Sequence, residues 1–466
     1  MILGREKELE KLDQLHNDSR FHFLIMYGRR RVGKTTILQE FAHKNDTTLF
    51  FSAQEKNDAL NLADFSRLVQ EGLDKTSIAP FQTWSDAFRY ISKKADPNKK
   101  LTLIIDEFPF IAKQNASVKS SLQHVIDHEW KEMNILLILC GSSVSVMIDE
   151  VLGYESPLYG RNTEVMEVKP FDYLGSTVFM ENRSNIEKAI CYGILGGIPR
   201  YLQEFDASKS IEENIREKIL RNGAFLNDEP SSMLRMELRE PSTYGSILEA
   251  ISKGYNQIKL IAEHIHEDPA KVSKYMNTLG TLRLIEKMVP CTEPKDSRKA
   301  IYRLSDNFFS FWYKYIFANR SYYEYLGEED ASREIMQNIN EYMGHIFERI
   351  CTTYIEKLAY AKKLPFVPAE IGRWWGNNPV IKAQDDVDIL AVSTKGEEAL
   401  FCECKFTNKP MPMSEYDDLV TAMQAFPSIP RKHMMFISKS GYTSDVIKRA
   451  NKEGAELKIL EDVYSF

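Results

Sequence analysis

A glycine-rich run near the N-terminus has the residue types that hold phosphate groups. It reads Gly28-Arg-Arg-Arg-Val-Gly33-Lys34-Thr35, and it follows the apolar run 23–27. The glycines let backbone N–H groups turn inward around anionic oxygens, Lys34 reaches the β- and γ-phosphates, and the Thr35 hydroxyl ligates Mg²⁺. The helical spacing that follows adds the partial positive charge of a helix N-terminus. The pattern predicts that ATP and Mg²⁺ are bound here, by Gly28, Arg29, Arg30, Arg31, Val32, Gly33, Lys34, Thr35 and Thr36.

Two acids at the end of a later apolar run supply the second half of such a site. Residues 101–105 are typical of a buried strand, and Asp106 and Glu107 follow them directly. Beside the glycine-rich loop, Asp106 would hold Mg²⁺ through water, and Glu107 would polarise the attacking water. The alternative is a strand with a solvated acidic end. The next apolar run, 135–140, leads to Ser142, which is predicted either to contact the γ-phosphate or to serve only the turn.

Further motifs in residues 1–205 resemble those of the archaeal-type AAA+ ATPases. Besides the loop and the acid pair they are Gly4-Arg5-Glu6 with Glu8-Leu9, Ser156-Pro-Leu-Tyr-Gly160-Arg161, and Gly196-Gly-Ile-Pro199-Arg200. The resemblance implies that Gly4 and Arg5 lie near the base or ribose. It implies that Pro199 and Arg200 contact the nucleotide from the lid side. It also makes Arg161 a candidate arginine finger across a subunit interface, which predicts a homo-oligomer. The alternative for each arginine is a surface or salt-bridge role.

Three acids and a lysine in the last third of the chain could bind a second metal ion. Glu348 lies in a helical stretch, Asp388 lies in a predicted strand, and Glu403 and Lys405 lie in the next predicted strand. If residues 395–396 close the turn, Asp388 and Glu403 face each other with Cβ atoms about 4.5–5.5 Å apart. Lys405 shares the face of Glu403 because it follows two residues later. Two close carboxylates repel unless a cation lies between them, so the pattern predicts Mg²⁺ at this pair.

This arrangement resembles the PD-(D/E)xK nuclease fold and the C-terminal domain often fused to archaeal-type ATPases. The resemblance covers residues 336–466 and implies that Asp388 and Glu403 are metal ligands, that Glu348 is an accessory acid and that Lys405 is the catalytic lysine. Two features depart from the pattern, since no proline precedes Asp388 and two further aspartates just before it compete for the metal. The alternative is an inactive nuclease-like domain.

The segment 241–320 is predicted to form a helix-turn-helix with a wing. Three helical patterns are followed by two short strand patterns, and the arrangement resembles winged-helix modules. The segment has twelve Lys or Arg and eight Asp or Glu, a local excess of four positive charges in a chain with a net charge of −7. Its third helix would enter the major groove, and Lys295, Arg298 and Lys299 would lie on phosphates, which predicts DNA as a partner. The alternative is a lid extension or a protein-contact domain.

The elements that must position these groups divide into four predicted domains. Apolar runs that alternate with helical stretches predict the parallel α/β sheet of a P-loop NTPase (AAA+) core at 1–205. A helical lid follows at 206–240, then the winged helix at 241–320. The α/β restriction-endonuclease-like domain occupies 336–466, after a predicted linker at 321–335. The length of 466 residues suits about three domains of ordinary size.

The composition predicts a cytoplasmic protein with no membrane partner. No apolar run reaches the length of about 18 residues that a membrane span needs, and we expect no signal peptide. Six scattered cysteines are predicted to be reduced. Together the patterns predict an ATP-hydrolysing enzyme that acts on or binds DNA and carries a magnesium-dependent nuclease domain. In the alternative, the chain is a nucleotide-switched regulator whose nuclease-like domain is an interaction module.

Overall fold

The computed structural model describes residues 2–75 and 79–466, and the chain forms two compact units. The first unit comprises Met1–Pro170 and Ile198–Arg200, and the second comprises Phe171–Gly197 and Tyr201–Phe466. Of the residues predicted to form the core at 1–205, residues 171–197 and 201–205 thus belong to the second compact unit. In the described part of the chain, no helix is long and apolar enough to cross a membrane.

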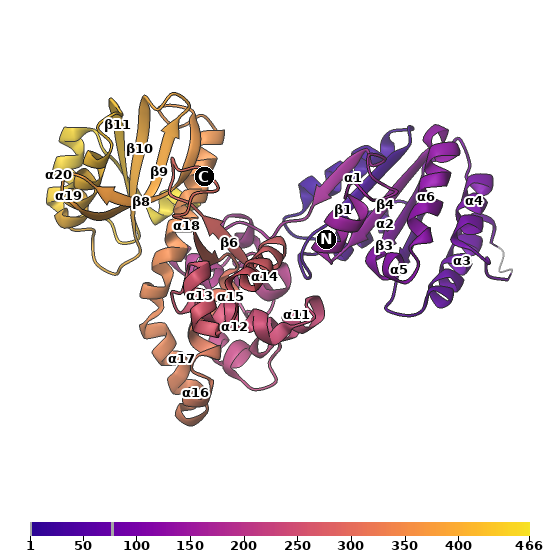
Figure 1. The fold of residues 1–466 in the computed structure, drawn as a ribbon, viewed down its shortest axis with the longest axis horizontal. Coiled ribbons are helices and arrows are strands. Elements are labelled where there is room, and N and C mark those ends of the chain that lie inside the picture. The colour runs from indigo at the N-terminus through magenta and orange to yellow at the C-terminus, as the bar shows by residue number, and fades with distance from the viewer. Residues whose placement is uncertain (1, 76–78) are drawn as a thin grey trace. The chain divides into compact units, whose positions relative to one another are not determined.

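A parallel five-stranded sheet forms the centre of the first unit (Figure 1). Its strands are β1 (His22–Tyr27), β2 (Thr48–Ser52), β3 (Leu101–Asp106), β4 (Ile135–Gly141) and β5 (Glu164–Glu167). The order is β2-β3-β4-β1-β5, and every neighbouring pair is parallel. The apolar runs 23–27, 101–105 and 135–140 form β1, β3 and β4, so these predicted strands are confirmed. In such a sheet, ligands bind beyond the carboxyl ends of the strands, where the glycine-rich loop and the acid pair both lie.

Helices cover both faces of this sheet because successive strand residues point to opposite sides. Phe23 and Ile25 of β1 join the core beneath one set of helices: α3 (Asp58–Asp74), α4 (Trp84–Lys94), α5 (Phe108–Gln114) and α6 (Ser117–His128). The other face is covered by α1 (Glu6–Asn17) and α2 (Lys34–Lys44). There His16 of α1 lies 2.9 Å from the Thr102 hydroxyl and packs edge-on against Phe41. Short segments complete the unit: η1 (Trp130–Glu132), α7 (Val144–Val146) and η2 (Met147–Val151).

The second unit begins with a helical region. Its elements are η3 (Gly175–Phe179), α8 (Asn185–Leu195), α9 (Pro199–Leu202, whose first two residues belong to the first unit), α10 (Ile211–Asn214), η4 (Ile215–Leu220), η5 (Phe225–Asn227) and α11 (Glu229–Glu237). Three helices and a hairpin follow: α12 (Pro241–Ser252), α13 (Ile258–Ile265), α14 (Pro269–Thr281), β6 (Ile285–Met288) and antiparallel β7 (Ile301–Leu304). Asp268 caps the third of these helices, because its carboxylate accepts hydrogen bonds from the N–H groups of Ala270 and Lys271.

The linker predicted at residues 321–335 is wrong, because this segment is helical. The chain continues through α15 (Asn307–Phe311), η6 (Trp312–Phe317), α16 (Arg320–Leu326), α17 (Glu328–Gln337) and α18 (Ile339–Tyr360). Ala331 and Ile335 are fully buried, and Tyr323 is nearly so. The spacing of four residues between Ala331 and Ile335 places them on one helix face, which offsets the acidic composition of the segment.

A mixed five-stranded sheet forms the C-terminal part of the second unit. Its strands are β8 (Pro368–Asn378), β9 (Ala383–Ser393), β10 (Glu398–Lys405), β11 (Arg431–Ser438) and β12 (Glu456–Ile459), in the order β12-β11-β10-β9-β8. The accompanying helices are α19 (Met413–Ala422), η7 (Met423–Ala425), α20 (Ser444–Glu453) and α21 (Leu460–Tyr464). Phe401 pairs with Leu390, and Cys402 pairs with Ile389. This is the pairing predicted from a turn at residues 395–396, so that prediction is confirmed.

Candidate functional site

The glycine-rich loop joins the end of β1 to the start of α2 and needs glycine at two positions. At Gly28, φ is +158°, and a Cβ atom would lie 2.3 Å from the carbonyl oxygen of Val168. At Gly33, φ is +95°, in the left-handed region that favours glycine. The first glycine therefore permits close packing of two backbones, and the second turns the chain into α2.

Lys34 and Thr35 stand at the first turn of α2, as predicted. Lys34 is 4% exposed, and its ammonium donates to the carbonyl oxygens of Gly28 (2.8 Å) and Arg29 (3.0 Å). The Thr35 hydroxyl donates to the Asp106 carboxylate over 2.8 Å. The Asp106 carboxylate therefore lies beside the hydroxyl that would ligate Mg²⁺, where it could hold the ion through a water molecule.

Glu107 and Ser142 form a second polar pair at the same edge of the sheet. Oε2 of Glu107 accepts hydrogen bonds from the Ser142 hydroxyl (2.9 Å) and the Ser142 N–H (3.2 Å). The backbone of Glu107 is left-handed, with φ of 53°, and its N–H donates to Asp106. Ser142 thus holds the carboxylate expected to polarise water. Direct contact between Ser142 and the γ-phosphate stays a prediction.

Arg5 and Arg161 both have protein partners in the first unit. Arg5 is buried and donates to the carbonyl oxygens of Val32 (3.0 Å) and Lys169 (2.9 Å). It therefore braces the glycine-rich loop, a role that the sequence did not suggest. The guanidinium of Arg161 donates to Asp127 from two nitrogens, at 2.8 and 3.0 Å. An arginine-finger role for Arg161 stays a prediction and would require that ion pair to open.

The remaining residues predicted to contact the nucleotide lie before α1, in the glycine-rich loop, on α2 and at the start of α9. Gly4 has φ of +67°, a conformation that favours glycine just before α1. Pro199 is half-buried and Arg200 is exposed at the start of α9. Arg29 is buried in the loop, and Thr36 is exposed on α2. The nucleotide contacts proposed for these residues stay predictions.

In the second unit, the structure brings the four residues of the predicted nuclease site into one cavity. Glu348 of α18, Asp388 of β9, and Glu403 and Lys405 of β10 line a space of about 400 Å³. Asp388 and Glu403 lie one step beyond the last paired residues of β9 and β10. The remaining lining residues are Arg373, Ile381, Asp385, Asp386, Glu415, Asp418, Leu419 and Thr421.

Burial and mutual repulsion shape the charges of this acidic cavity. Burial first, and then the charge of Glu403, raise the pKa of Asp388 to about 10. Burial also raises the pKa of Glu403 to about 7, against the opposing charge of Lys405. The Lys405 ammonium bridges Glu403 (2.7 Å) and Glu415 (3.0 Å), and the N–H of Cys404 donates to Asp388. Carboxylates in this environment favour a bound cation.

The role of Glu348 as a metal residue stays a prediction. Among the described residues, no three His, Cys, Asp or Glu side chains are grouped to hold a metal ion. Glu348 is instead held by His345 (3.1 Å) and Arg373 (3.5 Å). Because Mg²⁺ is commonly bound by one or two carboxylates together with substrate phosphate and water, Asp388 and Glu403 still fit this ion.

Sequence reasoning missed Arg373, which lies on β8 between two acids of this cavity. Its guanidinium is 2.6 Å from Asp386 and 3.5 Å from Glu348. No motif marks it, because its partners come from β9 and α18. Glu415, the second partner of Lys405, was missed for the same reason.

Comparisons with known proteins identify an ATPase domain in the N-terminal part of the chain. A protein-family model described as an ATPase domain predominantly from Archaea matches residues 2–205, and a second, described as archaeal and bacterial proteins of unknown function, matches 312–417. An uncharacterized protein of Methanocaldococcus jannaschii is 32% identical over 406 residues, which covers 87% of this chain and 88% of that protein.

Two proteins of Pyrococcus abyssi are also similar. An uncharacterized ATP-binding protein is 25% identical over 228 residues, which covers 43% of this chain and 68% of that protein. The solved structure of a Walker-type ATPase shares 22% identity with a TM-score of 0.48, and the match covers 67% of this chain and 96% of that one. The chain is therefore an ATP-binding P-loop ATPase that belongs to the same family as the Methanocaldococcus jannaschii protein, with the archaeal ATPase domain in residues 2–205.

Proposed function

We propose that this ATPase acts on DNA and that its C-terminal domain cleaves phosphodiester bonds with Mg²⁺. The observation that carries the proposal is the acidic cavity, where Asp388, Glu403 and Lys405 meet just beyond the last paired residues of β9 and β10. Each of these residues has a side chain that phosphodiester hydrolysis can use. The fold of five strands flanked by α18 and α19 supports the restriction-endonuclease-like assignment of residues 336–466.

ATP hydrolysis follows from the residues of the first unit. Lys34 would bind the β- and γ-phosphates, and the pair of Thr35 and Asp106 would hold Mg²⁺, which neutralises phosphate charge when bound. Glu107, oriented by Ser142, accepts a proton from or aligns the attacking water. A fixed carboxylate is suited to this task because it need not reorganise when the phosphate shifts.

In the acidic cavity, Asp388 and Glu403 would hold Mg²⁺, which polarises the scissile phosphate when bound. Lys405 lies on the same strand face as Glu403 and contacts it directly. Its ammonium can orient the attacking water or steady the negative charge that develops on the phosphate. Glu415 keeps the ammonium in place from α19.

DNA binding is proposed for the module of α12, α13, α14 and the β6–β7 hairpin. Val272, Met276 and Leu279 of α14 are buried, as expected for a helix whose other face is available for contact. Lys271, Lys274 and Asn277 are exposed on that other face. The turn of the hairpin also exposes basic side chains, at Lys295, Arg298 and Lys299. This arrangement supports a winged helix with a basic wing.

Cleavage of plasmid and single-stranded DNA with Mg²⁺ and ATP tests the nuclease. We expect Asp388→Ala and Glu403→Ala to lower the cleavage rate by at least about 10²-fold, since each removes a metal ligand. Asp417→Ala is the matched control, because Asp417 is an exposed acid of α19 that pairs with Arg449 outside the cavity. Equal cleavage by all three variants would contradict the nuclease and favour the nucleotide-switched regulator.

Duplex binding tests the wing. The double variant Lys295→Gln, Arg298→Gln should bind DNA more weakly, with a salt dependence reduced by about 0.9 for each phosphate that is no longer neutralised. Lys448→Gln, on the exposed face of α20, is the control. Unchanged affinity and slope in the double variant would place the DNA-binding surface elsewhere.

A further inference from the structure

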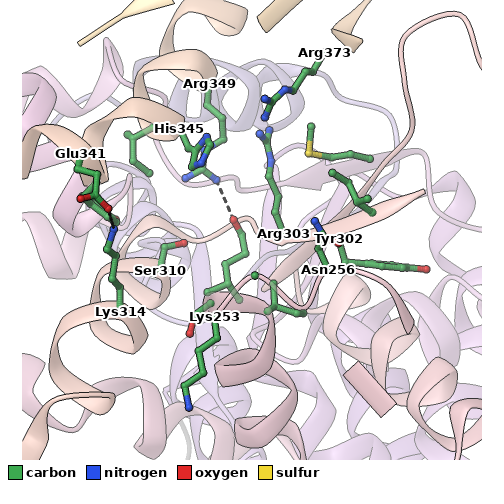
Figure 2. Close-up of a pocket in the computed structure, with 18 residues that line it drawn as sticks. Lys253, Asn256, Tyr302, Arg303, Ser310, Lys314, Glu341, His345, Arg349 and Arg373 are labelled. Carbon is green, nitrogen blue, oxygen red and sulfur yellow. Dashed lines mark hydrogen bonds and ion pairs between the residues drawn. The ribbon is translucent and has the colours of Figure 1, made fainter. Parts of the chain in front are cut away.

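A second cavity in the second unit lies outside every site predicted above. It has a volume of about 530 Å³ and is bounded by the end of α12, the strand β7, the segment η6 and the helix α18 (Figure 2). This volume is in the usual range for a small-molecule site, and it suits a ligand of about the size of one nucleotide.

Positive charge dominates the lining of this cavity. Among the described residues that line it, five are Lys or Arg and one is an acid: Lys253, Arg303, Lys314, Arg349, Arg373 and Glu341. The wall also has apolar side chains, among them Ile301, Leu304 and Ile346. Such a mixture fits a ligand with an anionic group joined to an apolar or aromatic body.

Two of these arginines are placed to bind an anion. Arg303 is 31% exposed and uses its Nε to contact Glu286, while its two terminal nitrogens form no hydrogen bond with any described residue. Figure 2 shows the guanidinium groups of Arg303 and Arg373 pointing toward one another. Arg373 also pairs with Asp386 and Glu348, but two guanidinium groups that converge still repel each other, and an anion between them relieves that repulsion.

Arg349 has a different task in the same wall. It donates to the carbonyl oxygens of Leu304 (3.2 Å) and Ser305 (3.0 Å) and also contacts Asn307. These bonds fix the end of β7 against α18, and so fix the position of the adjacent Arg303. Arg349 is therefore a supporting residue, and its loss would disturb the fold as well as any ligand.

The basic cavity and the acidic cavity share one lining residue, Arg373. Glu348, on the acidic side, is contacted by His345 and Arg373, which both line the basic side. Although burial opposes it, the hydrogen bond from His345 and the charges of Arg373 and Arg303 lower the pKa of Glu348. An anionic chain that reaches Asp388 and Glu403 can thus have its neighbouring phosphate at Arg373.

We propose that the basic cavity holds one nucleotide of a single nucleic-acid strand, with a phosphate between Arg303 and Arg373 next to the phosphate at Asp388 and Glu403. This inference rests on the proposed nuclease function and assigns it a single-stranded substrate. The sugar and base would lie against Ile301, Leu304 and Ile346. A duplex is too wide for a cavity of this volume, so the strand must be unpaired where it enters.

Binding of a fluorescein-labelled 12-nucleotide thymidine oligomer to the full chain, followed by anisotropy at several salt concentrations, tests this site. We expect Arg303→Gln to weaken binding about tenfold, as for the loss of one charge-assisted hydrogen bond, and to reduce the salt slope by about 0.7. Arg303→Lys should recover most of the slope because it keeps the charge. The control is Arg431→Gln, an exposed arginine at the opposite end of β10 and β11.

The outcomes separate this inference from the nuclease itself. Binding that depends on Arg303 in a protein that cleaves nothing would support the basic cavity and contradict the nuclease. Cleavage that needs Asp388, with binding equal in Arg303→Gln and Arg431→Gln, would overturn the inference alone. Thymidine monophosphate serves as competitor. If it displaces the oligomer at a concentration equal to that of the oligomer, the cavity is a site for a free nucleotide, and the proposal of a bound strand is overturned. No binding of the oligomer at low salt would also overturn it.

Discussion

The carboxylate of Glu107 is fixed by two donors from a single residue of the neighbouring strand end. Ser142 supplies both its hydroxyl and its N–H, and the backbone of Glu107 is left-handed, which costs about 1 kcal/mol or more for a residue other than glycine. This backbone conformation directs the Glu107 side chain toward Ser142, which is consistent with a functional need for that orientation. We therefore expect catalysis to depend on the carboxylate and, less strongly, on its support.

Replacing Glu107 should separate ATP binding from hydrolysis. Glu107→Gln is expected to lower kcat by about 10²–10⁴-fold with ATP affinity retained, because only the acceptor of the water proton is lost. Ser142→Ala should lower kcat about tenfold, as for one hydrogen bond to a charged group. Phosphate release and binding of a fluorescent ATP analogue measure the two effects. Lys34→Ala should abolish hydrolysis. Glu71→Gln on α3 is the control and should change neither hydrolysis nor ATP binding. Full turnover in Glu107→Gln would contradict the assignment of Glu107 as the residue that activates water.

Asp388 should make the protein less stable at high pH when metal is withheld. The pKa of Asp388 is raised in the folded state to about 10, from an ordinary value of 3.8. The contribution of this group to the free energy of unfolding is therefore fully present below pH 3.8 and is lost as the pH rises through about 10. Asp388→Asn keeps the acceptor for the N–H of Cys404 and removes the charge.

We expect this variant to have a higher free energy of unfolding than the native chain at pH 9 in EDTA, because the native chain releases the Asp388 proton on unfolding and the variant has no such proton to release. Urea unfolding at pH 5 and pH 9 measures the difference, which should shrink at the lower pH. Asp417→Asn is the control for an exposed carboxylate. A variant less stable than the native chain at pH 9 would contradict the raised pKa of Asp388.

Among the elements, the phosphate-binding loop depends on one close backbone contact. Gly28→Ala would place a Cβ atom 2.3 Å from the Val168 carbonyl oxygen, so the loop or the segment after β5 must move. We expect a loss of about 1–3 kcal/mol of stability, as for overpacking, and weaker ATP binding. Gly280→Ala in α14 is the matched control, because no atom lies within 4 Å of its added Cβ. Thermal unfolding and ATP titration measure both variants, and equal behaviour would contradict a tight loop.

The strongly apolar elements could be predicted from sequence, and the half-exposed ones could not. The strands β1 to β4 are nearly continuous apolar runs, as buried parallel strands must be. The strand β5 was missed because it has a glutamate at each end and no fully buried residue. The segment that forms α16 and α17 was predicted to be a linker, since its acidic composition hid the apolar face around Ala331 and Ile335.

Site residues could be predicted where their neighbours are close in sequence or set by strand pairing. The opposed positions of Asp388 and Glu403 follow from a short turn, and the contact of Thr35 with Asp106 follows from adjacent strand ends. The partners of Arg5 and Arg373 come from separate elements, so no spacing could reveal them. Sequence patterns report periodicity along one element, whereas these contacts depend on how elements pack.

At the scale of the whole molecule, ATP and DNA should influence each other's binding by the same factor. If ATP binding changes DNA affinity, thermodynamic linkage requires that DNA change ATP affinity equally, commonly by about 5–150-fold. A non-hydrolysable ATP analogue and a labelled duplex measure both affinities on the full chain.

Lys34→Ala should abolish the effect, because the ammonium that binds the phosphates is removed, and Asp388→Asn should leave it unchanged. Affinities that are independent of each other would mean that the ATPase does not control the module of α12, α13, α14 and the β6–β7 hairpin, for which DNA binding is proposed. The regulator alternative also predicts linkage, so only the cleavage assay separates the two functions.

The position of the helix α8 in the second unit decides where the chain can be divided into separately expressed fragments. It lies within the ATPase family match at residues 2–205, yet it belongs to the second compact unit. There Ile194 is fully buried, and the carbonyl oxygen of Gly193 accepts a hydrogen bond from Tyr342 of α18. A fragment cut at 205 would carry this helix without its partners, and the complementary fragment would lack it. Both fragments should aggregate when expressed alone. The end of the ATPase family match at residue 205 is therefore a poor place to divide the chain.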